Sequence, residues 1–196
     1  MARDIESSRH LFYAVYFYCM KYLLNIFIFL VLILASISCQ AAPASSGPLQ
    51  LATSTQNNVE VVITLERGDS NQDILSATFI PQSPSLHLYS KDIPKTGVDG
   101  LGRPTLLELS ENSPMQAVSE LTESALPQKP ATPPLELLIY PAGPITLSLL
   151  ILLPDGNSWT NDEVFVTYMA CDEMGCRPPV QNKSIAIKIP GRGLFQ

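Results

Sequence analysis

From residue 59 onward, the sequence consists of short β-rich runs separated by turn residues, and this pattern constrains the fold more than any other feature. In the run EVFVTYM, alternate side chains form two sets, so one set faces a core and the other faces a second surface. Groups such as GDSN, PQSP, YPAGP and PDGN separate the runs and are typical of turns. The runs are VEVVITL (59–65), ILSATFI (74–80), SLHLYS (85–90), TLLEL (105–109), LELLIY (135–140), ITLSLLILL (145–153), EVFVTYM (163–169) and SIAIKI (184–189).

About eight short strands without a long helical pattern predict an antiparallel β-sandwich. The 17 prolines of the chain also argue against a helical bundle. One segment, Ser110–Pro134, does not fit a strand pattern, because it is polar, proline-rich and long for a connection in a compact domain. Such segments are functional covers or disordered insertions. Within it, residues 117–125 are compatible with one or two helical turns.

The formal net charge of −6 and the lack of a basic cluster exclude nucleic acid as a partner, since binding to phosphates needs a cationic surface. The sequence also lacks the motifs G-x-S-x-G and H-E-x-x-H and a phosphate-binding glycine loop. His87 lies inside a strand pattern, where a packed histidine is the more common outcome than a catalytic one. No cofactor is expected from these observations.

The N-terminal region contains an apolar run from Tyr22 to Ile37 that follows Lys21 and precedes small residues and Cys39. This order resembles a bacterial lipoprotein signal, in which Cys39 would be lipidated and become the mature N-terminus. Two alternatives stay open, namely ordinary cleavage after Ala41 and a retained anchor helix within residues 1–39. Each of them predicts an exported protein, and lipidation or a retained anchor would tether it to a membrane.

Two further expectations concern the same end of the chain. Residues 1–19 form a second apolar stretch ahead of the signal core, so we expect translation to begin at Met20. Residues 40–58 are small, polar and dotted with proline, which predicts a flexible linker. The folded domain is then expected at residues 59–190, with a short tail at 191–196.

Of the four cysteines, Cys19 lies upstream of or within the apolar segment, and Cys39 lies at the processing site. The exported domain therefore retains one pair, Cys171 and Cys176, which should be able to form a disulfide in an oxidising compartment. Gly175 offers the positive φ that a tight reversal between the two cysteines requires.

The chemistry of this pair has several possible assignments. A structural disulfide closing a loop of about six residues would stabilise the fold by only roughly 2 kcal/mol. Redox pairs are commonly close in sequence, because both sulfurs must be presented together to an attacking thiolate. Asp172 and Glu173 would disfavour a thiolate, whereas Arg177 would favour one at Cys176. The spacing alone does not separate the structural from the redox assignment.

A third assignment is a Cu(I) site, because thiolates and thioethers are soft ligands that suit this ion better than zinc. Two methionines accompany the cysteines, and ordinary packing is the simpler explanation for both. The sulfur ligands of such a site would be Met169, Cys171, Met174 and Cys176.

The segment VTYMACDEMGCRPPV followed by SIAIKIP resembles the end of the N-terminal extracytoplasmic domain of DsbD-type thiol:disulfide interchange proteins. The upstream segments LHLYSKDIPKTGVDGLGRPTLLEL and YPAGPITLSLLILL also resemble parts of such domains, in the same order. The resemblance covers roughly residues 59–190. It implies an immunoglobulin-like sandwich whose cysteine pair cycles between dithiol and disulfide. By this resemblance Cys171 and Cys176 are the redox pair, and Tyr168, Pro178 and Pro179 frame it. Arg177 is added to the framing residues because its charge lies beside Cys176.

The resemblance further implies a membrane-embedded thiol reductant as electron donor and exported thioredoxin-like or disulfide-isomerase proteins as acceptors. Members that contain the whole pathway continue into membrane helices and a thioredoxin-like domain, whereas this sequence ends at Gln196, so separate partners are expected. Members also shield the pair with an aromatic residue on a mobile loop. Residues 91–136 contain no aromatic residue here, so a cover from Ser110–Pro134 would use aliphatic side chains or Met115.

These observations together predict an exported, membrane-tethered β-sandwich, periplasmic or at the cell surface, that acts as a thiol:disulfide oxidoreductase module. The alternative is a non-catalytic interaction module with a structural disulfide, and Cu(I) handling comes third.

Overall fold

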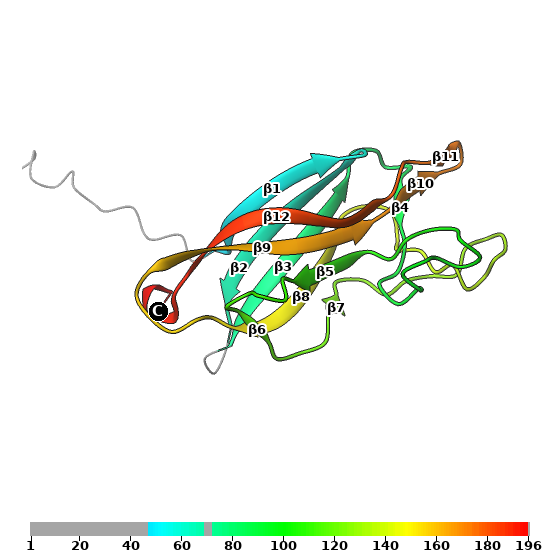
Figure 1. Ribbon diagram of the computed structural model, residues 1–196. Helices are drawn as coiled ribbons and strands as arrows, with labels where there is room; N and C mark the ends of the chain where they lie inside the picture. The colour runs from blue at the N-terminus through cyan, green and yellow to red at the C-terminus, as the bar shows by residue number, and fades with distance from the viewer. Residues whose placement is uncertain (1–46, 69–71, 196) are drawn as a thin grey trace, which may run out of the picture. The chain divides into compact units, whose positions relative to one another are not determined.

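The computed structural model describes residues 47–68 and 72–195, and almost all of the regular structure among them is β-strand. The strands pair antiparallel in three sheets, which confirms the predicted all-β antiparallel sandwich (Figure 1). The elements are β1 (Leu49–Gln56), β2 (Val59–Arg67), β3 (Asp73–Pro81), β4 (His87–Leu88), β5 (Leu106–Leu109), β6 (Gln116–Ala117), β7 (Thr122–Glu123), β8 (Ile145–Leu152), β9 (Trp159–Tyr168), β10 (Ala170–Asp172), β11 (Gly175–Cys176), β12 (Val180–Pro190) and the 3-10 helix η1 (Arg192–Leu194).

The two larger sheets pack face to face and enclose the main core (Figure 1). One sheet has the order β1-β2-β3-β8-β6, with β7 also paired to β8, and the other has the order β12-β9-β5. In β2, β3 and β8 every second side chain is buried, as the alternation in the sequence predicts. On the opposite face of the first sheet, Ser76 bonds Ser148 and Thr78 bonds Thr146 across β3 and β8.

The prediction of a flexible linker at residues 40–58 is wrong over its second half, because Leu49–Gln56 forms the edge strand β1. An edge strand needs backbone pairing on one side only, so a mostly polar sequence suffices when a few apolar side chains reach the core. The connection to β2 is a two-residue turn in which Asn57 and Asn58 have φ of 51° and 63°. Two asparagines with positive φ are typical of a hairpin turn, and this was the available sequence signal.

The segment Ser110–Pro134 is partly strand, and the expected helical turns at 117–125 are absent from it. Two short strands, β6 and β7, pair with the free edge of β8. Backbone bonds from Val118 N to Leu150 O (2.8 Å) and from Ser124 N to Thr146 O (2.9 Å) extend this pairing. Open hydrogen-bonding groups along β8 thus favour extended backbone over helix in this segment.

One predicted strand is shorter than expected, and another is absent. The run at residues 85–90 contributes only His87–Leu88 as β4, followed by isolated bridges at Tyr89. The run at residues 135–140 forms no strand and pairs only through Ile139, which bridges to Tyr89 and to Gln128. Beyond β12, Phe195 packs against the main core, so the predicted tail at 191–196 is in part attached to the domain.

The predicted signal or anchor at 1–39, the start at Met20, and Cys19 and Cys39 all lie outside the described residues. Within 47–68 and 72–195, no helix has the length and apolar character needed to cross a membrane.

Candidate functional site

The candidate site is built on the third sheet, of order β11-β10-β4, which we call the cysteine sheet. In Figure 1 it lies at one end of the sandwich, where β9 continues into β10. Asp172 pairs with Gly175 at the end of the hairpin, so only Glu173 and Met174 form the turn. The backbone N–H of Met174 donates to Asp172 Oδ1 (3.0 Å), and Gly175 has a φ of 136°, which explains the glycine at this position.

The structure joins Cys171 and Cys176, which face each other across β10 and β11, in a disulfide. The bond spans a sequence separation of 5 and links two strands that the hairpin already holds together. It therefore ties no distant elements of the fold to each other.

The two sulfur-bearing residues differ in exposure. Cys171 is 3% exposed, whereas Cys176 is exposed, as is the neighbouring Gly175. Met174, at the tip of the same hairpin, is 96% exposed. Because a thiolate must approach a disulfide sulfur directly, this arrangement presents Cys176 and conceals Cys171.

Tyr89, which follows β4, places its hydroxyl against the disulfide. The hydroxyl donates to Cys171 Sγ at 3.0 Å and lies 3.8 Å from Cys176 Sγ. Burial raises the pKa of Tyr89, so the hydroxyl keeps its proton and stays a donor at neutral pH. A donor at this position would stabilise a thiolate that forms on Cys171 when the disulfide opens.

A small apolar cluster, separate from the main core, surrounds Cys171. Its buried members besides Cys171 are Tyr89, Ile93 and Leu137. Gly102 has a φ of 72°, and a Cβ there would lie 2.7 Å from Leu137 and 3.3 Å from Tyr89. This glycine lets the backbone at Gly102 approach the cluster closely.

The sequence left open whether the segment Ser110–Pro134 covers the cysteine pair, and this segment contributes no residue to the cluster around Cys171. Met115, one of the expected covering side chains, is buried in the main core instead. The aromatic residue beside the disulfide is Tyr89, which lies just outside the aromatic-free stretch 91–136. Its register against Cys171 depends on pairing between distant strands, so the sequence offered no local signal for it.

The other predicted flanking residues have mainly structural contacts. Arg177 forms an ion pair with Asp172 (3.0 Å), so its charge is engaged beside the hairpin. Tyr168 is buried in the main core, and its hydroxyl donates to Gln56 O at 3.1 Å. Pro178 and Pro179 are exposed and separate β11 from β12, and Pro178 O accepts a bond from Asn57 Nδ2 (2.7 Å).

The methionines of the Cu(I) alternative lie in different environments. Met169 packs against the cluster around Cys171, whereas the Met174 side chain extends into solvent. In the part of the chain that the structure describes, no group of three or more His, Cys, Asp or Glu side chains is arranged to hold a metal ion.

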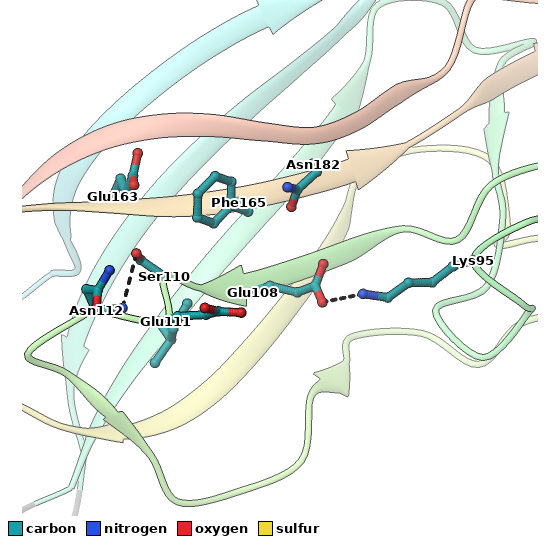
Figure 2. A pocket seen from close by; sticks show the side chains of 9 residues that line it. Lys95, Glu108, Ser110, Glu111, Asn112, Glu163, Phe165 and Asn182 are labelled. Atoms are coloured by element: carbon teal, nitrogen blue, oxygen red, sulfur yellow. Dashed lines mark hydrogen bonds and ion pairs between the residues drawn. The ribbon is translucent and has the colours of Figure 1, made fainter.

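A polar groove of about 480 Å³ lies elsewhere, over β5, β9 and β12 (Figure 2). In this view Phe165 lies between Glu163 and Asn182. Lys95 reaches across to Glu108 at 2.7 Å. The groove includes neither cysteine and belongs to a different sheet from the cysteine pair.

No family model and no curated protein matches this sequence. Among solved structures, the chain is similar to the DsbD N-terminal domain of Neisseria meningitidis in its reduced form. The two are 12% identical with a TM-score of 0.39, and the match covers 77% of this chain and 90% of that chain. The case for a function therefore rests on the disulfide and its surroundings.

Proposed function

We propose that this protein is an extracytoplasmic thiol–disulfide exchange module. In this proposal the Cys171–Cys176 pair relays reducing equivalents from a membrane-embedded thiol reductant to exported thioredoxin-like or disulfide-isomerase proteins. The observation that carries the proposal is the asymmetry of the disulfide, with Cys176 exposed on a hairpin and Cys171 buried beneath the Tyr89 hydroxyl.

The exchange follows from this geometry. A partner thiolate attacks Cys176 Sγ, a new S–S bond forms, and the electron pair of the old bond leaves on Cys171. The Tyr89 hydroxyl donates to that leaving sulfur, which stabilises the thiolate. A second partner thiol then resolves the mixed disulfide and leaves the pair as a dithiol. The dithiol reduces an acceptor disulfide by the reverse sequence.

The alternative is a structural disulfide in an interaction module. A disulfide across one short hairpin restricts the unfolded chain little, so it would stabilise the fold by only roughly 2 kcal/mol. The main core lies in the sandwich and does not include the cysteine pair. Both points favour exchange over a structural role.

The reduction potential of the pair separates these two functions. We expect a value within the range of exchange proteins, about −120 to −270 mV, measured by equilibration with glutathione or dithiothreitol. A potential well below about −300 mV would assign the bond to structure.

Trapping tests the proposed asymmetry and the partners together. Cys171→Ala leaves the exposed thiol at Cys176, and we expect it to accumulate mixed disulfides with exported thioredoxin-like proteins. Cys176→Ala is the matched control, since its remaining thiol is buried, and it should accumulate few. Equal trapping by the two variants, or trapping by neither, would count against the mechanism.

The proposal includes membrane tethering through a lipid attached to Cys39, which becomes the mature N-terminus. Mass spectrometry of the mature N-terminus should find a lipid-modified Cys39. An unmodified N-terminus at the residue after Ala41 would instead indicate ordinary signal cleavage without lipidation.

A further inference from the structure

The side chain of His87 lies in one row with the two cysteines. In the cysteine sheet, Cys171 pairs directly with Cys176 on one side and with His87 on the other. Directly paired residues of an antiparallel ladder point to the same face, with Cβ atoms about 4.5–5.5 Å apart. The imidazole therefore neighbours Cys171 on the side opposite Cys176.

Tyr89 connects the same groups from the next position on this face. Its ring meets the His87 ring edge to face, with centroids 5.5 Å apart and an interplanar angle of 81°. Its hydroxyl donates to Cys171 Sγ at 3.0 Å. On this face Cys171 thus accepts a bond from a hydroxyl donor and is paired in register with a residue that carries a titratable base.

The charges around His87 set its protonation state. Burial lowers the pKa of His87, and the negative charge of Asp172 opposes this effect. Asp172 is itself paired with Arg177, and Tyr89 remains neutral at physiological pH. His87 is therefore an uncharged imidazole at neutral pH in the disulfide form, able to accept a proton.

We infer that His87 exchanges a proton with Cys171 each time the cysteine pair is oxidised or reduced. This inference rests on the exchange function proposed above. When the dithiol reduces a substrate, Cys176 thiolate first attacks the substrate disulfide and expels one substrate thiolate. The Cys171 thiol then gives its proton to the imidazole, and its electron pair forms the bond to Cys176 Sγ. The second substrate thiolate leaves, so the substrate gains two electrons and the pair loses two. In the reverse direction, the imidazole takes up a proton from solvent and passes it to the sulfur of the leaving Cys171.

The resolving step is measurable with oxidised glutathione as the probe. Reduced full-length chain reacts with it to form a mixed disulfide at Cys176, and attack by Cys171 then releases the second glutathione. We expect His87→Phe, which retains the aromatic contact with Tyr89, to slow this release about tenfold at pH 7, because the imidazole no longer accepts the proton of the Cys171 thiol. At pH 10, well above the ordinary thiol pKa of about 8.5, the two rates should converge.

This convergence distinguishes proton exchange from structural damage, which would slow the reaction at every pH. His87→Gln serves as a second variant should the phenylalanine disturb folding, and it should give the same pH-dependent loss. Met174→Ala, on the exposed tip of the same hairpin, is the matched control and should keep the profile of the unsubstituted chain.

Two outcomes overturn the inference. If the unsubstituted chain releases glutathione and both His87 variants give superimposable pH profiles, the inference fails while the exchange function stands. If the unsubstituted chain forms no mixed disulfide with glutathione, both proposals fail.

Discussion

The sandwich core and the cysteine sheet are built on different principles. The core is formed by large apolar side chains from two facing sheets, many of them fully buried, such as Phe79, Leu147 and Ile189. The cysteine sheet comprises three very short strands, and one face of it carries a disulfide, a tyrosine hydroxyl and an imidazole. Large buried apolar side chains are thus concentrated in the first region, and the residues of the proposed exchange lie in the second. A sheet that contributes little to the main core can carry polar and reactive groups without weakening the fold.

The largest expected effect comes from the core. Phe79 is fully buried and contacts Tyr168 edge to face with ring centroids 5.6 Å apart. Phe79→Ala should lower the free energy of unfolding by about 3–5 kcal/mol through lost burial and the resulting cavity. The double variant Cys171→Ala/Cys176→Ala should lose at most about 2 kcal/mol. Urea denaturation measures both, and a larger loss in the cysteine variant would reverse the comparison and favour a structural disulfide.

Two buried tyrosines, Tyr168 in the main core and Tyr89 beside the disulfide, test the same difference between the two regions. Tyr168→Phe removes the bond to Gln56 O and should lower the free energy of unfolding by about 1 kcal/mol without changing exchange. Tyr89→Phe removes the donor to Cys171 Sγ and should slow reduction by dithiothreitol about tenfold, because a hydrogen bond to the departing thiolate is lost. Stopped-flow reduction and urea denaturation of both variants give the result. The assignment of roles is wrong if the two variants behave alike in both measurements.

The smallest effect concerns the pH dependence of stability. Burial lowers the pKa of His87 below its ordinary value of 6.5, so the unfolded chain binds a proton more readily than the folded one. Protonation therefore favours unfolding, and stability should fall as the pH drops below about 6.5. His87→Gln should remove part of this loss when the free energies of unfolding at pH 7 and pH 5 are compared. An unchanged difference between the two pH values would show that His87 is not responsible.

Local patterns predicted much of the sandwich. Alternation at a period of two marked β2, β3, β8, β9 and β12, because that period is a property of the strand backbone itself. Polar strands escaped prediction, since β1, β6 and β7 are held mainly by backbone bonds to a neighbouring strand. An edge strand of that kind has no apolar period, and its existence depends on the partner that pairs with it.

The sequence by itself determined the class of the fold and the identity of the cysteine pair, because strand periodicity and sequence spacing are local properties. The tertiary structure alone decided which sulfur is exposed and which residues neighbour the other one. Tyr89 and His87 precede Cys171 by more than eighty residues and reach it only through the register of β4 against β10. Register is fixed by pairing between distant segments, so the chemistry of this site follows from the folded sheet rather than from the C-x4-C motif.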